Sequence, residues 1–318
     1  MNQQITLDTI NRAHDRIRPY IHRTPVLINQ TINSWVCASI FFKCENFQKI
    51  GAFKARGGLN AILQVAANNE GKAITTHSSG NHAQAVAFAA RIVDLPAYVV
   101  MPSNAPQVKK DAVKGYGAQV IECEPNIAAR EAGVVEVINR TGAVLVHPFD
   151  NDRVIAGQAT AAKELLEDAG EDQPFDVIFT PVGGGGMLSG TALAVHYLSP
   201  QTKVIGCEPE GAADAILSFK SGNVETAPYI KSVADGLLPN LSERTLAIIR
   251  AYVSDILTVS DEEIIAAMKL IWERMKIVIE PSSAVALAVV LKHKDKFAGQ
   301  KIGIILTGGN VDMGKLPF

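Results

Sequence analysis

Short apolar runs recur along the chain and suggest the strands of a buried sheet. Each run is rich in β-branched or aromatic residues and lacks the strict polar–apolar alternation of a half-exposed strand. A strand that is covered on both faces has this continuous apolar character. The runs therefore predict buried, mostly parallel strands at 39–45, 97–102, 118–123, 143–148, 176–182, 203–209 and 302–309.

Helix-like segments separate these runs. The segment 81–93 is rich in alanine with an apolar stripe, and 156–170 ends at a glycine, as helices often do. The segment 261–275 opens with acidic residues after Ser260, which predicts an N-cap there. Alternation of strand and helix over this length predicts an α/β protein with parallel sheets. The segment 147–158, with Pro148 and several turn formers, is a plausible crossing point between two domains.

The composition is that of a globular protein of roughly two domains. The 318 residues are 47% hydrophobic and 19% charged, with a formal net charge of -2. The sequence shows no basic stripe of the kind that marks nucleic-acid binding. It also shows no apolar core of a signal peptide and no apolar stretch of roughly 18 residues that would span a membrane. No CxxC pair occurs, so we expect reduced thiols in a cytoplasmic protein at Cys37, Cys44, Cys123 and Cys207.

A run of glycines joins one strand-like run to a helix-like segment, and it consists of Gly183, Gly184, Gly185 and Gly186. Consecutive glycines are entropically unfavourable to order, but they let backbone N–H groups approach a ligand closely. A helix that begins there adds a dipole that favours an anion, so phosphate is the expected guest. The pattern is neither GxGxxG nor the P-loop pattern, which disfavours a dinucleotide or a P-loop nucleotide. An ordinary glycine-rich turn is the alternative.

A polar cluster precedes the alanine-rich segment and consists of Ser78, Ser79, Gly80, Asn81 and His82. Helix capping is one interpretation, because Ser and Asn are good caps. One cap needs only one such residue, however. Hydroxyl and amide donors in front of a helix also form a good cradle for a carboxylate.

A lysine among small and apolar neighbours is the third feature. Lys54 lies in "GAFKARGG"; an exposed lysine is the ordinary interpretation, but a desolvated one has a lowered pKa and attacks carbonyl groups more readily. The run at 302–309 ends in Thr307 and two glycines, and ligands of open α/β sheets gather at the carboxyl ends of strands. Pyridoxal 5'-phosphate uses a lysine for its aldehyde, a glycine loop for its phosphate and a polar group for its ring nitrogen. The combination favours that cofactor.

Nearly the whole chain resembles the serine racemase and serine/threonine dehydratase family, whose members are fold-type II pyridoxal-phosphate enzymes. The resemblance rests on motifs that follow one another in one order: "HRTPVL" (22–27), "GAFKARGG" (51–58), "SSGNHAQA" (78–85), "MPSNAPQVKKDAVKGYGA" (101–118), "PVGGGGMLSG" (181–190), "IEPSSA" (279–284) and "TGGNVD" (307–312). It implies two open twisted parallel sheets flanked by helices. It also implies a large cofactor-binding domain from 1–72 and 150–318, and a small mobile domain from 73–149.

The resemblance implies a role for each cofactor residue. Lys54 would bind the cofactor aldehyde as an imine and later act as the base at Cα, with Phe53 packed against the ring. Asn81 would hydrogen-bond the 3'-oxygen of the ring. Thr307 would stand opposite the ring nitrogen, where a neutral hydroxyl suits β-elimination because it does not force that nitrogen to stay protonated. The glycine loop and Met187 would hold the phosphate.

The same resemblance assigns the substrate contacts. Ser78, Asn81 and His82 would receive the substrate carboxylate. Ser79 occupies the position that serves serine racemases as a second base, on the cofactor face opposite Lys54. Racemisation would then accompany elimination; the alternative for Ser79 is a second capping hydroxyl.

Two further positions match the family. "CEPEGAAD" (207–214) matches its divalent-cation loop, in which Glu208, Asp214 and the carbonyl of Ala212 would bind Mg²⁺ or Ca²⁺. Solvated loop carboxylates are the alternative from the residues alone. Arg130 aligns with an arginine near the mouth of the active site that could pair with a second acidic group, and a surface arginine is the alternative.

The implied activity is β-elimination of a β-hydroxy amino acid such as L-serine or L-threonine to a 2-oxo acid and ammonia. A threo-3-hydroxyaspartate dehydratase is the rival within this class, and a non-catalytic protein that binds a phosphate ligand is the rival from another. Because the chain stops soon after "TGGNVD", we expect no C-terminal regulatory domain of the threonine deaminase kind. The resemblance also implies a homodimer and leaves open a nucleotide effector at the dimer interface.

Overall fold

Two sheets organise the chain, of which the computed structural model describes residues 5–170 and 174–318. Within these residues the larger sheet has six strands in the order β1-β2-β10-β7-β8-β9. Its neighbours run parallel, except that β1 is antiparallel to β2. The strands are β1 (Val26–Leu27), β2 (Ser39–Cys44), β7 (Val177–Pro181), β8 (Lys203–Pro209), β9 (Asp255–Val259) and β10 (Lys301–Leu306).

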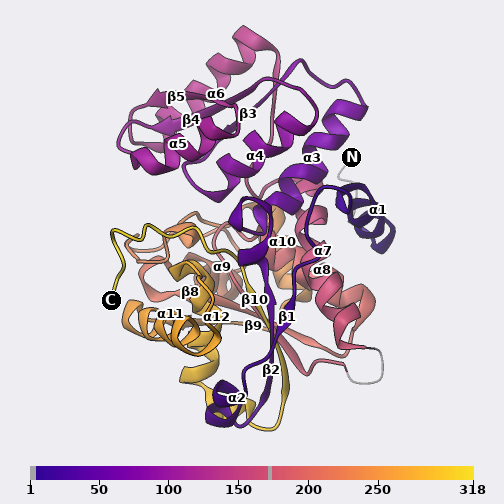
Figure 1. Ribbon diagram of the computed structural model, residues 1–318, viewed down its shortest axis with the longest axis vertical. Coiled ribbons are helices and arrows are strands. Elements are labelled where there is room, and N and C mark those ends of the chain that lie inside the picture. The colour runs from indigo at the N-terminus through magenta and orange to yellow at the C-terminus, as the bar shows by residue number, and fades with distance from the viewer. Residues whose placement is uncertain (1–4, 171–173) are drawn as a thin grey trace.

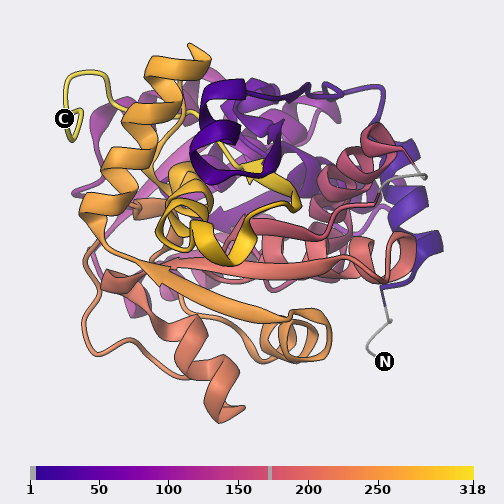
Figure 2. The same ribbon diagram turned by 90° about the horizontal axis from the view of Figure 1, so that it is seen from below.

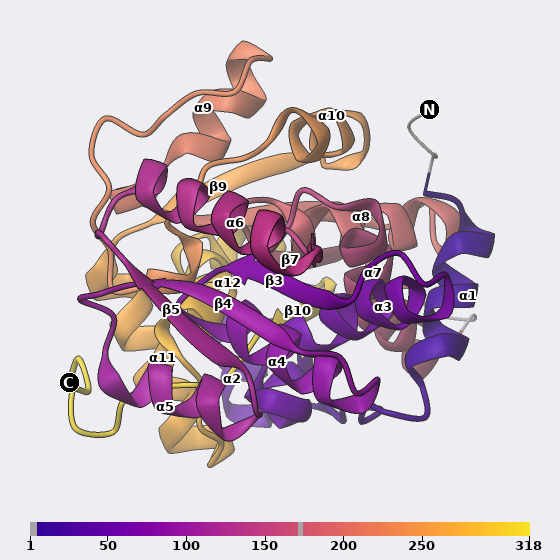
Figure 3. The ribbon, with the colours of Figure 1, turned by 90° about the horizontal axis from the view of Figure 1, so that it is seen from above.

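The smaller sheet lies above the larger one in Figure 1, and Figure 3 looks onto it from above. Its four described strands run parallel in the order β5-β4-β3-β6. They come from one continuous segment: β3 (Ala73–His77), β4 (Ala97–Pro102), β5 (Gln119–Cys123) and β6 (Ala143–Leu145). The larger sheet is built from the chain on both sides of that segment.

Helices cover both faces of each sheet, as the view from below also shows for the larger one (Figure 2). One face of the larger sheet packs against α2 (Gln30–Val36), α11 (Asp261–Met275), α12 (Pro281–Lys292) and α13 (Lys294–Phe297). Its other face packs against α1 (Leu7–Ile17), α7 (Asp152–Ala169), α8 (Gly186–Leu198), α9 (Asp214–Ser221) and α10 (Glu243–Tyr252). The smaller sheet lies between α3 (Lys54–Ala67), α4 (Asn81–Ile92) and α5 (Gln107–Gly115) on one face and α6 (Ile127–Thr141) on the other.

The predicted α/β architecture with two parallel sheets is confirmed. The strands β7, β8 and β10 are buried on both faces apart from the first residue of β8 and of β10, as their continuous apolar runs indicate. The strand β5 departs from this pattern because it lies at an edge of the smaller sheet and is half-exposed. The helix predicted over 261–275 is α11, and the Ser260 side chain caps it within a capping box.

The described residues also contain short 3-10 helices: η1 (Glu45–Phe47), η2 (Lys49–Gly51), η3 (Glu210–Ala212) and η4 (Asp235–Leu237). All four cysteines are free; Cys44 and Cys207 are buried, whereas Cys37 is exposed. None of the described helices combines the length and the apolar character that crossing a membrane requires.

Candidate active site

Lys54 is the first residue of α3 and lies at the carboxyl end of the larger sheet. The loop in front of it is tied to the end of β10, because the Phe53 N–H donates to the Thr307 carbonyl at 3.0 Å. The Lys54 amine in turn donates to the carbonyl of Pro148 at 2.8 Å. Lys54 therefore occupies the end of the sheet where α/β proteins bind their ligands.

The environment of Lys54 favours the uncharged amine. Burial lowers the pKa of Lys54 to about 8, although the charge of Glu280 acts in the opposite direction. About a tenth of such amines is uncharged near neutral pH, compared with fewer than about one in a thousand for an ordinary lysine. The ring of Phe53 adds to the apolar setting, since its centroid lies 5.2 Å from Nζ. The uncharged amine is the form that attacks a carbonyl carbon.

A buried ion-pair network holds the helix that carries Lys54. Arg56 donates through Nε and Nη2 to Glu45 at 2.7 and 2.8 Å, and through Nη1 and Nη2 to Glu164 of α7 at 2.9 and 2.8 Å. Lys43 of β2 donates to Glu164 at 2.7 Å. Two buried bases thus face two buried acids, which offsets the desolvation of all four groups. The start of α3 is thereby fixed to β2 and α7.

The glycine loop follows β7 and is fully buried. A Cβ at Gly184 would lie 2.3 Å from the ring of Phe149, and one at Gly183 would lie 2.8 Å from Cα of Leu237. Gly185 has φ +87° and is the N-cap of α8, a conformation that other residues adopt only with strain. Since Phe149 follows Pro148, the loop and the Lys54 amine contact the same short segment.

The first residues of α8 add N–H donors to this loop. Gly186 and Met187 begin the helix, and the first four N–H groups of a helix have no acceptor within it. Such donors, together with the helix dipole, favour an anion. The loop therefore has the geometry of a phosphate cradle close to a nucleophilic amine.

The polar cluster connects the carboxyl end of β3 to α4. The N-cap of α4 is Gly80, and no side chain caps this helix, so the capping interpretation of Ser78 and Ser79 is wrong. Ser78 Oγ instead accepts the Gly80 N–H at 3.3 Å. Space around Gly80 is open, since a Cβ there would meet no atom within 4 Å. The start of α4 therefore adjoins open space at Gly80, with Ser78 and Ser79 directly before it in the chain.

Asn81 brings this cluster to the larger sheet. Its Nδ2 donates to the two carboxylate oxygens of Glu280 at 2.9 and 3.2 Å, and its Oδ1 accepts from Asn310 at 2.8 Å. The ring of His82 is buried, and its Nε2 lies 2.9 Å from the carbonyl of Val146. Burial lowers the pKa of His82 well below its usual value, which keeps the ring neutral. Of the predicted carboxylate contacts, Asn81 thus lies at the junction of the sheets, whereas the His82 ring is turned toward Val146.

Glu280 is a site residue that sequence reasoning missed. It precedes α12, is 7% exposed, and lies so close to Gly308 that a Cβ there would be 2.9 Å from its Oε1. Burial raises the pKa of Glu280 to about 7. An acid placed between apolar residues in "VIEPSSAVA" was the available signal, because an acid is seldom buried without a partner.

Arg130 lies on α6, on the other face of the smaller sheet from α4. It is half-buried, and its buried Nε has no hydrogen-bond partner among the described residues. Burial lowers the pKa of His77, which directly precedes Ser78, and the charge of Arg130 lowers it further. Arg130 therefore lies near the start of the polar cluster and retains an unused donor.

The carboxylates of the predicted cation loop are both buried. Glu208 accepts the N–H groups of Ala215 and Ile216 at 2.7 and 3.0 Å, whereas Asp214 accepts that of Leu241 through Oδ2 at 3.1 Å. Burial raises the pKa of Glu208 to about 8 and that of Asp214 to about 6. The buried Oδ1 of Asp214 has no partner among the described residues. No group of three or more His, Cys, Asp or Glu side chains suited to a metal occurs among them, so a cation here would also need the carbonyl of Ala212 and water.

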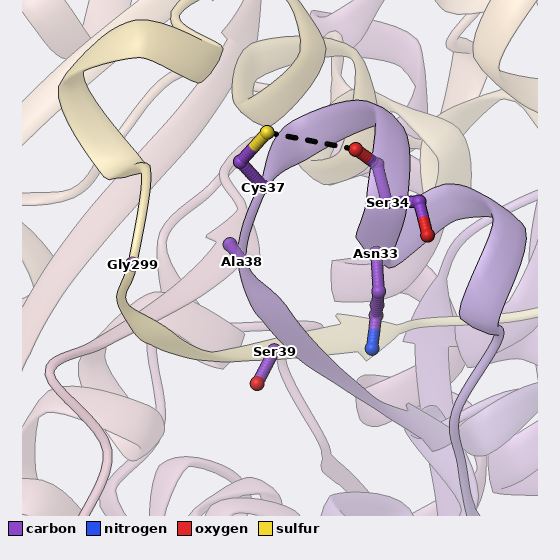
Figure 4. A pocket seen from close by; sticks show the side chains of 6 residues that line it. All are labelled: Asn33, Ser34, Cys37, Ala38, Ser39 and Gly299. Carbon is purple, nitrogen blue, oxygen red and sulfur yellow. Dashed lines mark hydrogen bonds between the residues drawn. The ribbon is translucent and has the colours of Figure 1, made fainter.

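A pocket of about 310 Å³ lies elsewhere and carries none of this chemistry (Figure 4). It adjoins Ser39 and Gly299, at the amino ends of β2 and β10, whereas Lys54 lies at the carboxyl ends of the strands. No charged side chain lines it, and the thiol of Cys37 donates to the carbonyl of Ser34. The amino-end pocket is therefore separate from the candidate active site.

Comparisons with known proteins agree with this geometry. Residues 17–308 match the family described as "Pyridoxal-phosphate dependent enzyme". The chain is 49% identical to the beta-hydroxyaspartate dehydratase of Paracoccus denitrificans, over 98% of both chains. It is 47% identical to the serine racemase of Dictyostelium discoideum, over 98% of this chain and 97% of that one. Its fold matches the T.th. threonine deaminase with a TM-score of 0.92 at 42% identity, over 97% of this chain and 99% of that chain.

Proposed function

The chain belongs to the family of pyridoxal-phosphate-dependent enzymes, and from this premise we propose that it is an ammonia-lyase acting on a β-hydroxy α-amino acid. The products would be ammonia and a 2-oxo acid, because the water lost from Cβ is consumed again when the resulting enamine is hydrolysed. One observation carries the proposal: the half-buried Lys54 amine and the glycine loop contact the same segment, Pro148 and Phe149. A lysine nucleophile and a phosphate cradle are the two features that pyridoxal phosphate requires of a protein.

The residues fit this cofactor. When bound, pyridoxal phosphate supplies a conjugated ring that accepts the electrons released at Cα of an attached amino acid. Lys54 would hold its aldehyde carbon, and the N–H groups of residues 183–187 would hold its phosphate. Thr307 is 4% exposed at the end of β10 and would face the ring nitrogen with a neutral hydroxyl, while Phe53 would lie against the ring.

Lys54 is also the proposed base. Once its amine is released by the amine of the substrate, its lowered pKa leaves a share of it uncharged and able to take the proton from Cα. The carbonyl of Pro148 accepts one N–H of this amine and so orients the group. Loss of hydroxide from Cβ as water completes the elimination.

The loop from Ser78 to His82 is the proposed carboxylate cradle. Hydroxyl groups, the Asn81 amide and the N–H groups at the start of α4 are donors, and the open space at Gly80 admits the substrate. Ser79, half-buried on this loop, is the proposed second base, opposite Lys54. Proton loss to one of them and return from the other would racemise serine.

A 3-hydroxyaspartate is the second candidate substrate, and Arg130 is the observation that favours it. Its buried Nε lacks a partner among the described residues and lies close to the start of the carboxylate cradle. A side-chain carboxylate of the substrate would supply the missing acceptor. The relative from Paracoccus denitrificans carries the name beta-hydroxyaspartate dehydratase, in keeping with this choice.

A divalent cation is the proposed occupant of the loop at 208–214. The two buried carboxylates repel each other, and Asp214 Oδ1 lacks a partner in the described part of the chain, so a cation would satisfy both. Glu208, Asp214 and the carbonyl of Ala212 would hold Mg²⁺ or Ca²⁺. Its part would be structural, because the loop joins β8 to α9 rather than to Lys54.

We also propose a cytoplasmic homodimer in which residues 73–149 form a small mobile domain and residues 1–72 and 150–318 the large one. The mobile domain carries the carboxylate cradle, and the large domain carries Lys54. Closing the mobile domain over Lys54 would exclude water from the reacting groups. A nucleotide effector at the dimer interface is an open part of this proposal, and effector titrations of the dimer test it.

Product analysis tests the proposed function. The protein is incubated with pyridoxal phosphate and then with L-serine, D-serine, L-threonine or each diastereomer of 3-hydroxyaspartate. Formation of a 2-oxo acid reports elimination, and chiral chromatography reports racemisation. A protein that only binds a phosphate ligand would give neither, and would not take up the cofactor in a form that borohydride fixes. Faster turnover of a 3-hydroxyaspartate than of serine, lost in Arg130→Ala, would identify the acidic substrate.

A further inference from the structure

Glu280 comes from the motif "IEPSSA", which the reaction described above does not use. Its carboxylate is buried between the two sheets, where it accepts from Asn81 of α4 at 2.9 and 3.2 Å. Its backbone N–H donates to the carbonyl of Gly308, at the end of the larger sheet, at 3.0 Å. A buried acid close to the segment that carries a reactive lysine invites a functional explanation.

The hydrogen bonds around Asn81 define which way its amide points. Asn310 donates from Nδ2 to the carbonyl of Ile50 at 2.7 Å and to Oδ1 of Asn81 at 2.8 Å. Asn310 thus uses one Nδ2 hydrogen for each of these two acceptors. The oxygen end of the Asn81 amide is therefore committed to Asn310, and its nitrogen end to the carboxylate of Glu280. A flipped Asn81 would place donor against donor at one end and acceptor against acceptor at the other.

We propose that Glu280 is a positioning residue for the chemistry at Lys54: it fixes the Asn81 amide together with Asn310, and its carboxylate is the counter-charge of the Lys54 amine. One N–H of Asn81 suffices for the carboxylate, which leaves the second as a donor to an oxygen atom bound beside Lys54. The inference rests on the proposed function, because only a cofactor joined to Lys54 would use that donor.

The charges around Glu280 support this arrangement. Asp235 of η4 raises its pKa and Lys109 of α5 lowers it, and these two form an exposed ion pair at 2.6 Å. A Cβ at Gly308 would lie 2.9 Å from Oε1 of Glu280 and 3.1 Å from Cβ of Ala52, two residues before Lys54, so the carboxylate adjoins the segment that carries the amine. Burial lowers the pKa of Lys54, and the charge of Glu280 opposes this effect. The exposed pair is screened by water, whereas Glu280 is not. Removing the charge of Glu280 should therefore affect Lys54 far more than removing that of Asp235.

The test follows how fast the cofactor-free protein acquires a visible absorption band after mixing with pyridoxal phosphate, as a function of pH. The midpoint of this profile reports the pKa of the Lys54 amine, since only the uncharged form reacts. For wild type we expect a midpoint of about 8. Glu280→Gln keeps the shape and an acceptor oxygen but loses the charge, so its midpoint should fall by about one unit. Asp235→Asn is the matched control, and its midpoint should move by less than about half a unit.

Asn310→Ala tests the orientation of Asn81 separately, because it leaves the charge of Glu280 in place. Its midpoint should stay at the wild-type value, while equilibrium affinity for pyridoxal phosphate should fall about three- to tenfold, as expected for one hydrogen bond. Circular dichroism of each variant verifies the fold. If Glu280→Gln does not fold, the affinity of Asn310→Ala still decides whether Asn81 is positioned in this way.

The possible results distinguish a failure of the proposed function from a failure of the role of Glu280. A wild-type protein that never acquires the band contradicts the proposed function and this inference with it. A wild-type protein that does, together with a folded Glu280→Gln whose midpoint is unchanged or shifts no more than Asp235→Asn, overturns the role of Glu280 alone. Unchanged cofactor affinity in Asn310→Ala overturns the positioning of Asn81.

Discussion

Substitution of Gly184 should weaken the binding of pyridoxal phosphate through a steric conflict with the ring of Phe149, which a second substitution at Phe149 can relieve. A Cβ at this position would lie 2.3–2.5 Å from three atoms of the Phe149 ring, far inside contact distance. In Gly184→Ala the loop and the ring cannot both keep their positions. Overpacking of this kind amounts to about 1–3 kcal/mol. Because the loop must return to its place to hold the phosphate, the affinity should fall about 5- to 150-fold.

Titration of the cofactor-free protein with pyridoxal phosphate, followed by the visible band, measures this effect. Gly115→Ala is the matched control, because it makes the same change in α5 where a Cβ would meet no atom within 4 Å. Its affinity should equal that of wild type. The double variant Gly184→Ala/Phe149→Ala should recover most of the lost affinity, with a coupling of about 0.5–3 kcal/mol. Wild-type affinity in Gly184→Ala, or additive losses in the double variant, would refute the steric reasoning.

Three further predictions concern pH, cations and stability. The rate at which cofactor-free protein captures pyridoxal phosphate should rise through about pH 8 and then level off, since the uncharged Lys54 amine reacts; a flat profile would contradict the lowered pKa. Mg²⁺ or Ca²⁺ should raise the melting temperature more above about pH 8 than below about pH 6. Without a cation, stability should fall as the pH rises through the raised pKa values of Asp214 and Glu208, because both carboxylates then become charged in the folded protein. The cation should have no such effect on Asp214→Asn. Arg56→Leu leaves the buried Glu45 without a counter-charge and removes one of the cations beside Glu164, so it should lose about 3–5 kcal/mol in denaturant unfolding. Lys292→Ala, at an exposed pair, should lose less than about 1 kcal/mol, and similar losses would argue against the buried network.

The sequence predicted elements best where both faces of the element are buried or where a cap ends it. The bounds expected for 97–102 and 203–209 agree with β4 and β8, and α11 begins where Ser260 caps it. The strand β3 was missed because threonines interrupt its apolar run. Thr75 and Thr76 are nevertheless fully buried, since their hydroxyls donate to the carbonyls of Tyr98 and Val146. Such partners are invisible in the local sequence.

The candidate site shows the same limit. Lys54, the glycine loop and Thr307 were found because each carries a local signal: a lysine in an apolar stretch, an unusual run of glycines, and a hydroxyl at the end of a strand. Glu280 was missed because its meaning depends on Asn81, which is 199 positions away. The capping interpretation of the polar cluster was wrong because the backbone at Gly80, rather than a side chain, forms the cap of α4.

The central claim is that Lys54 carries the cofactor, and borohydride reduction tests it most directly. The protein is incubated with pyridoxal phosphate, reduced, digested and examined by mass spectrometry, with Lys54→Ala and Lys49→Ala as parallel samples. Lys49 lies on the same loop but belongs to η2. The account predicts one modified peptide that contains Lys54, present in wild type and Lys49→Ala and absent in Lys54→Ala. Modification of another lysine at equal yield, or none at all in wild type, would contradict it.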